Sequence, residues 1–241
     1  MLIRFLILTA LLPALGGCLM GTAQSRVTSD YAAQVKQVGV ISVLSSHPNI
    51  SFLSTSAMDS HFAAAMLDGW DIDRVAYGRL VPRLQHKGYT VKILPRTGAL
   101  AAAQQSDWRL PLADSIENAA YAAGKAAGVD MVVVVEAQVE DDFVTHTNQR
   151  VRGYGLQRAF DTGPFVYATV MVGAFDVERE FVVGRADGAM VKAADDSLWD
   201  TDYEQRGGPI KVAPPTASAL LEQLEQVLGD VIGVAAQEAG L

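Results

Sequence analysis

The sequence predicts one α/β domain, with a β-α-β-α-β core followed by a β-hairpin and a C-terminal helix, so that helices pack on a single mixed sheet. Short β-branched segments alternate with helical patterns in the first half, which is typical of a sheet covered by helices. Two long apolar segments on either side of residues 178–180 predict the hairpin. The chain has 241 residues and 50% hydrophobic content, which is ample for a core.

The first strand is expected within residues 35–44, VKQVGVISVL, because β-branched residues dominate this segment. The His47-Pro48-Asn49 sequence ends it, and residues 50–55 are expected to form a short extended piece. The pattern of residues 58–67 is ambiguous, and our expectation there is a short helix.

A helix is predicted over residues 71–87, with Asp71 as its N-cap and Gly88 at its C-terminal end. Pro82 lies inside it and predicts a kink or a break, because proline lacks the N–H that a helix needs. Residues 89–94 alternate and predict the second strand. The apolar residues at helical spacing are Ile72, Val75, Ala76, Leu80 and Leu84.

Residues 95–111 are expected to form a loop with an alanine-rich insert, followed by a helix over 114–127 that stops at Gly128. Glu117 occupies the capping-box position of this helix. The continuous apolar run at 131–135, extending to about residue 139, predicts a strand buried on both faces.

The hairpin is predicted to comprise residues 165–177 and 181–194, and the polar, acidic residues 195–215 are predicted to form a solvated loop. A final helix begins near Thr216 and carries one apolar stripe. We expect this stripe to dock on the protein's own sheet rather than to seat another helix. Its members are Leu221, Leu224, Leu228, Val231 and Ala235.

The N-terminus has the features of a targeting segment. Arg4 precedes an apolar run over residues 5–15, which is too short to span a bilayer. Leu15-Gly16-Gly17-Cys18 then resembles the lipobox of bacterial lipoproteins. This resemblance implies that residues 1–17 are a signal peptide and that Cys18 is lipidated. The alternative is a buried or incidental cysteine within an ordinary signal peptide or membrane anchor.

Lipidation of Cys18 would anchor the protein to a membrane. A lipoprotein cysteine carries two or three acyl chains, which bind a membrane permanently, whereas a single acyl chain binds only reversibly. Residues 18–34 would then be the lipidated cysteine and a tether, and residues 35–238 the single domain. Leu19, rather than Asp, follows Cys18, which resembles the sorting signal for the outer membrane. We therefore expect a periplasm-facing domain anchored to the outer membrane.

A family resemblance follows from two segments. Ala127-Gly128-Val129-Asp130 with MVVVVEAQVE, and then YATVMVGAFDVEREFVVGRADGAM, resemble a strand and the following hairpin of CsgG-like outer-membrane lipoproteins. The same fold occurs in lipoprotein activators of penicillin-binding proteins and in the TolB N-terminal domain. Residues 143–160 do not alternate as a transmembrane β-strand would, so pore formation is not implied.

The net charge and the motifs that the sequence lacks further limit the functions to be expected. A net charge of −8 repels phosphate backbones, so no nucleic-acid partner is expected. The sequence contains no nucleophile elbow, HExxH motif, Walker A loop or cysteine pair, and no two of its four histidines lie within four residues of each other. We expect no metal or other cofactor.

Residues 140–164 are predicted to form one long loop, with Gly153-Tyr154-Gly155 as a flexible piece of it. Arginine and aromatic residues are enriched in protein interfaces. Arg150, Arg152, Tyr154 and Arg158 are therefore the candidate partner-binding residues, and no catalytic residue is assigned.

These observations predict a non-catalytic envelope lipoprotein that presents a periplasmic domain to another envelope protein, as part of an outer-membrane-associated assembly. One alternative is a periplasmic hydrolase whose Asp, Glu and His residues converge only in space. Another is a ligand-binding or stress-sensing lipoprotein, which predicts an apolar cavity. The sequence does not indicate an oligomeric state.

Overall fold

The computed structural model describes residues 24–56, 59–105, 113–147, 149–204 and 208–241. The predicted signal peptide, Cys18 and the first part of the tether lie outside these residues. The helices are α1 (Ser29–Ala32), α2 (Ile72–His86), α3 (Ala99–Gln105), α4 (Ala113–Ala127) and α5 (Pro214–Glu238), with 3₁₀ turns η2 (Asp196–Leu198) and η3 (Thr201–Glu204). The strands are β1 (Gln37–Ser42), β2 (Asn49–Leu53), β3 (His61–Met66), β4 (Thr90–Ile93), β5 (Met131–Ala137), β6 (Val139–Asp141), β7 (Arg150–Ala159), β8 (Phe165–Asp176), β9 (Phe181–Ala193) and β10 (Ile210–Lys211).

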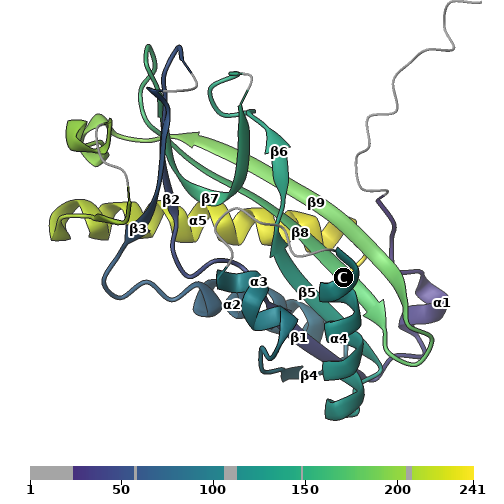
Figure 1. Cartoon of the computed structure of the whole chain (residues 1–241). Coiled ribbons are helices and arrows are strands. Elements are labelled where there is room, and N and C mark those ends of the chain that lie inside the picture. Colours follow the sequence, from purple (N-terminus) through teal and green to yellow (C-terminus); the bar gives the residue numbers. More distant parts are fainter. Residues whose placement is uncertain (1–23, 57–58, 106–112, 148, 205–207) are drawn as a thin grey trace, which may run out of the picture.

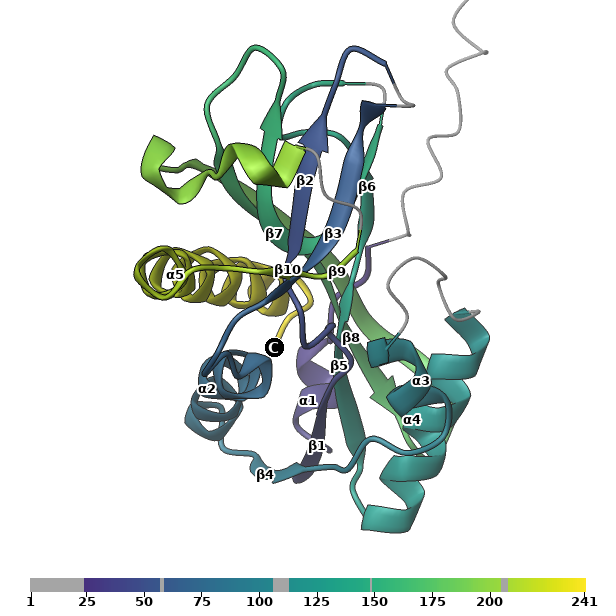
Figure 2. The same ribbon diagram turned by 60° about the vertical axis from the view of Figure 1, so that its left-hand side comes forward.

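These strands form one mixed sheet in the order β10-β3-β2-β7-β8-β5-β1-β4, with β6 added to β7 and β9 added to β8 (Figure 1). Helices α2 and α5 cover one face of the sheet, and α3 and α4 lie on the other (Figure 2). The predicted α/β class, with helices packed on a single mixed sheet and a C-terminal helix, is confirmed.

Strand β8 is the centre of this arrangement because its two edges are used differently. One edge pairs with β9 along the whole strand. The other edge pairs with β7 over residues 165–169 and with β5 over residues 170–176. The sheet therefore forks, and β7 and β5 lead into two separate groups of strands.

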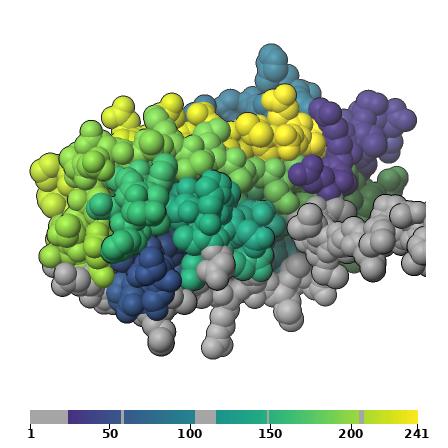
Figure 3. Space-filling model, turned by 90° about the horizontal axis from the view of Figure 1, so that it is seen from above, coloured from purple at the N-terminus to yellow at the C-terminus, as the bar shows by residue number. Residues whose placement is uncertain are grey.

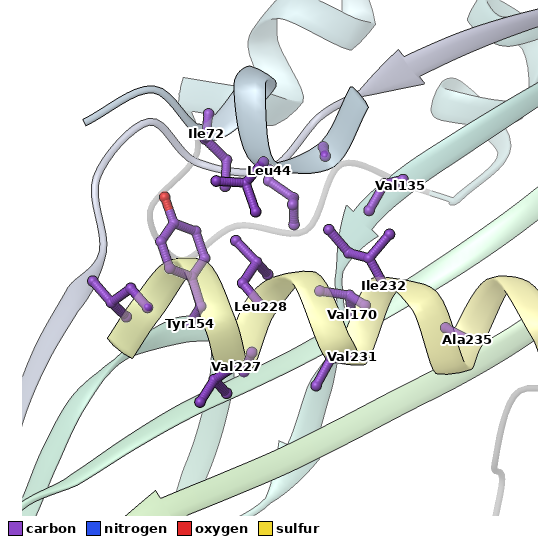
Figure 4. Packing of buried hydrophobic residues seen from close by; sticks show 14 of the residues in the cluster. Leu44, Ile72, Val135, Tyr154, Val170, Val227, Leu228, Val231, Ile232 and Ala235 are labelled. Carbon is purple, nitrogen blue, oxygen red and sulfur yellow. The ribbon is translucent and has the colours of Figure 1, made fainter. Parts of the chain in front are cut away.

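The larger core lies between the sheet and α5 (Figure 4). Leu224, Leu228, Val231 and Ala235 of the predicted stripe are buried there, whereas Leu221 is half-buried. Docking of α5 on its own sheet is thus confirmed.

The N-terminal segment from Ser25 onward is part of the domain. Ser25 forms an antiparallel bridge with Arg185 of β9, and the Val27 N–H donates to the Ala239 carbonyl at 2.9 Å. Val27 and Val35 are buried. Figure 3 shows these purple residues against the yellow C-terminal helix. Residues 25–34, predicted to belong to the tether, therefore pack on the fold.

Helix α2 begins as predicted, with the Asp71 carboxylate accepting hydrogen bonds from two backbone N–H groups. The helix continues through Pro82, so of the predicted kink or break, the break is wrong. Both Pro82 and Gly78, whose carbonyl loses its usual donor, are exposed. Water can satisfy that carbonyl, which lowers the cost of an internal proline.

Three local predictions are wrong. Residues 61–66 form β3 instead of a helix, because pairing with β2 and β10 outweighs the weak strand propensity of alanine. The alanine-rich insert forms α3, as alanine favours. The predicted loop at 140–164 contains β6 and the ten-residue strand β7.

The glycines of Gly153-Tyr154-Gly155 explain the last error. A Cβ on Gly155 would lie 2.0 Å from the Asn49 carbonyl oxygen, so glycine is needed for β7 to pair with β2. Gly153 has a φ of 65°, a backbone conformation that glycine adopts at little cost. The two glycines fit the strand into the sheet, and the expected flexible loop is wrong.

Candidate functional site

The four predicted partner-binding residues all lie on β7, but the strand does not present them together. Tyr154 is only 1% exposed, and its hydroxyl points away from α5 (Figure 4). The hydroxyl donates to the Ser45 carbonyl at 2.6 Å and accepts from the Trp70 indole at 2.9 Å. Burial raises its pKa well above the usual value. Tyr154 thus supports the core and is not available to a partner.

Arg158 also has internal partners. Its Nε donates to the Thr162 carbonyl at 3.0 Å, and its Nη1 lies 3.7 Å from the Glu204 carboxylate. The guanidinium carbon is 6.0 Å from the centre of the Trp199 ring. These contacts attach η3 to the end of β7.

Arg150 and Arg152 are more accessible. The Arg150 side chain is 66% exposed and lies 3.7 Å from Asp141, which is itself 91% exposed. Such exposed pairs contribute little stability. Arg150 and half-buried Arg152 line a small hollow with Phe62 and Tyr167. We call Arg150, Arg152 and Asp141 the Arg150 surface.

The loop between β6 and β7, next to the Arg150 surface, is organised by Asp142. This carboxylate is 5% exposed and accepts six hydrogen bonds between 2.6 and 3.0 Å, from the Val144, Thr145 and Thr147 amides, both threonine hydroxyls and the Gln157 amide. Burial raises the pKa of Asp142, but the hydrogen bonds from Thr145 and Thr147 outweigh it and bring the pKa to about 2. Six donors thus hold an ionised carboxylate and fix the loop beside Arg150.

Sequence analysis missed a second charged group, which we call the Glu136 cluster: Glu117, Glu136, Arg152, Arg185 and Asp187. Glu136 follows Val132 and Val134 on the α4 face of β5, since alternate residues of a strand share a face. Arg185 of β9 donates to Glu117 of α4 at 2.5 Å, with both side chains largely buried. The signal in the sequence is the carboxylate that ends the MVVVVE run.

Electrostatics links these residues. Burial raises the pKa of Glu136 to about 7, although Arg185 and Arg152 lower it and Glu117 and Asp187 add to the increase. Glutamate with a pKa near neutrality is typical of functional sites, and buried ion-pair networks produce it too. Arg152 belongs to both the Glu136 cluster and the Arg150 surface, so it connects the two.

A cavity of about 350 Å³ lies between α1, the end of α4 and the β8–β9 turn. Charged residues account for much of its lining, including Lys125, Asp130, Asp176 and Arg179. This is not the apolar cavity that the ligand-binding alternative predicts. No histidine lines it, whereas Asp130, Asp176 and Glu178 bring three carboxylates to it.

Within the residues that the structure describes, no group of three or more His, Cys, Asp or Glu side chains has the arrangement of a metal site. Among the same residues, no helix combines the length and apolarity needed to cross a bilayer.

Comparison with known proteins finds no matching family model and no matching curated protein. Several solved structures align with most of the chain at low similarity. The PelC dodecamer from Paraburkholderia phytofirmans is 12% identical with a TM-score of 0.36, covering 91% of this chain and 96% of that chain. Protein XCC0632 from Xanthomonas campestris is 10% identical with a TM-score of 0.39, covering 90% and 91%.

Lipoprotein GNA1162 from Neisseria meningitidis is 11% identical with a TM-score of 0.33, covering 79% of this chain and 99% of that chain. Bacterial lipoproteins are therefore among the structural neighbours. At this level of similarity the likeness carries no conclusion about function, because one fold serves many functions.

Proposed function

We propose that this protein is a lipid-anchored envelope protein whose domain binds another envelope protein through the Arg150 surface, without catalysing a reaction. We also propose that the protein is located at the outer membrane and is related to the CsgG-like lipoproteins. The main support for this proposal is the attachment of the N-terminal segment to the fold at Ser25.

This attachment limits how far the domain can lie from the lipid. Seven residue steps separate Cys18 from Ser25, and an extended chain spans at most about 3.3–3.6 Å per residue. A lipid on Cys18 therefore holds the domain within about 25 Å of the membrane. A partner of such a domain must itself be in the envelope.

The anchor is tested with the Cys18→Ser variant. Without a thiol to accept the lipid, the protein should move from the membrane fraction to the soluble periplasm or remain unprocessed. Density-gradient separation of the two membranes tests the outer-membrane location. A mature wild-type protein whose mass shows an unmodified thiol at Cys18 would refute the anchor.

The binding surface is tested by site-specific photo-crosslinking in intact cells. A photoreactive residue in place of Arg150 should crosslink to one envelope protein, and the same residue in place of exposed Glu238 on α5 is the matched control. Substitution of Arg152 by Glu should reduce the crosslink, because it reverses a charge on the same surface. Equal crosslinking at both positions, or none at Arg150, would contradict the proposal.

A further inference from the structure

The cavity between α1, the end of α4 and the β8–β9 turn has a buried aliphatic floor. Val35, Val129 and Val177 line it, and each of them is at most 7% exposed. They belong to the segment after α1, the α4–β5 connection and the end of β8, and Figure 1 shows these parts near one another. The cavity volume of about 350 Å³ lies within the usual range for small-molecule sites. The valines can therefore cover a short hydrocarbon chain.

The polar part of the lining is rich in hydrogen-bond acceptors. One carboxylate oxygen of Asp130 accepts from two backbone N–H groups at the start of β1, at 2.7 and 2.8 Å, and no described residue donates to the other oxygen. Asp176 is 5% exposed and accepts the Arg179 N–H at 2.7 Å. Glu178 is exposed, and within the described residues it forms no ion pair. Acceptor capacity thus remains on carboxylates that face the cavity.

The donors of the lining already lie beside carboxylates of the protein. Lys125 forms an ion pair with Glu180, and Nη1 of Arg179 lies 4.0 Å from Asp176. Burial raises the pKa of Tyr31 well above its usual value and the Asp176 carboxylate adds to the increase, so the tyrosine hydroxyl stays protonated and donates to Asp176. A ligand that complements this lining must therefore supply cationic donors.

The three carboxylates are spread around the cavity. In the described part of the chain they do not converge as the ligands of a metal ion do. One small cation therefore cannot use all of them, whereas a molecule with two cationic groups can reach carboxylates at separate points. An aliphatic chain between its two cationic groups would pack on the valine floor.

We propose that this cavity binds a linear aliphatic diamine, whose ammonium groups donate to the carboxylates and whose methylene chain covers Val35, Val129 and Val177. The proposal is independent of the proposed function, because the cavity shares no residue with the Arg150 surface. Tyr31, Gln34 and Val35 belong to the N-terminal segment, so a bound diamine holds this segment on the fold. A ligand that binds only the folded protein also stabilises it.

Isothermal titration calorimetry of the purified full-length protein in a nonionic detergent tests the proposal. Cadaverine, an aliphatic diamine, should bind at one site per chain. Pentylamine has the same carbon chain with a single ammonium group, and it should bind about tenfold more weakly. Absence of cadaverine binding, or equal affinity for pentylamine, would refute the proposal. Displacement of cadaverine by an equal concentration of magnesium chloride would overturn it too, because it would show only the attraction of cations to an acidic protein.

Two variants test the position of the site. Glu178→Gln removes one carboxylate and should weaken cadaverine binding several-fold without changing the Tm of the free protein. Glu222→Gln is the matched control, since Glu222 is exposed in the first half of α5 and does not line the cavity. Gln34→Lys adds a cation to the lining and should abolish binding. Unchanged affinity in both Glu178→Gln and Gln34→Lys would contradict a diamine site in this cavity.

Discussion

Two carboxylates in this protein, buried Asp142 and half-buried Glu136, have opposite pKa shifts because their surroundings differ in hydrogen-bond donors. Asp142 accepts six hydrogen bonds, which outweigh the effect of burial and hold its pKa at about 2. The pKa of Glu136 rises to about 7, because burial disfavours its ionised form more than Arg185 favours it. These shifts predict opposite dependences of stability on pH.

The Asp142 carboxylate ionises more readily in the folded than in the unfolded protein. It therefore contributes stability above its ordinary pKa, and this contribution is lost as pH falls toward 2. Asp142→Asn should reduce the free energy of unfolding by roughly 2 kcal/mol at pH 7 and by roughly half as much at pH 3. Urea unfolding at the two pH values measures the difference, and a pH-independent loss would contradict this account.

Glu136 behaves in the reverse way, because its pKa is higher in the folded protein. Its ionisation opposes folding as pH rises from about 4.5 to about 7. Glu136→Gln should therefore match the wild type near pH 4.5 and be more stable at pH 8, by at most roughly 3 kcal/mol. Thermal or urea unfolding across this range is the measurement. A variant less stable than the wild type at pH 8 would show that ionised Glu136 makes a favourable contact.

At the scale of elements, α5 closes the larger core through one buried face. Leu228 is fully buried under this helix, and Leu221 of the same predicted stripe is only half-buried. Leu228→Ala should lower the free energy of unfolding by about 2–5 kcal/mol, the usual cost of a large-to-small change in a core. Leu221→Ala is the matched control and should cost clearly less in the same urea titration. Equal losses would mean that the two positions are equally enclosed.

The elements that could be predicted from the sequence are those whose own residues carry the periodic pattern. Helices α2 and α5, strand β1 and the β8–β9 hairpin belong to this group. Strands β3 and β7 could not be predicted, because alanine in β3 and arginine and glycine in β7 become strand residues only through pairing with neighbours distant in sequence.

The candidate site was only partly predictable for the same reason. Exposed Arg150 could be found from composition, whereas burial of Tyr154 depends on Trp70 and Ser45, which lie far away along the chain. The Glu136 cluster depends on three strands and a helix that meet only in the folded protein.

At the scale of the whole molecule, the N-terminal segment joins both ends of the domain. Val27 and Val35 are buried, and Val27 bonds to Ala239 directly after α5. A chain that starts at Lys36 should therefore be several kcal/mol less stable than a chain that starts at Gln24, because two buried side chains and the Ser25 bridge are lost. Urea unfolding of the two truncated proteins measures this, and equal midpoints would show that the segment adds nothing.

Among the described strands, only β8 pairs with both of the groups that diverge from it. Removing the hairpin would leave the free edges of β7 and β5 without their shared neighbour, so neither group can be isolated as a smaller stable module. Duplication or exchange of either group between related proteins would have to carry residues 165–193 with it. The hairpin is thus the part of the architecture that both strand groups require. Insertions and deletions are better tolerated in the strands of each group that lie farthest from β8.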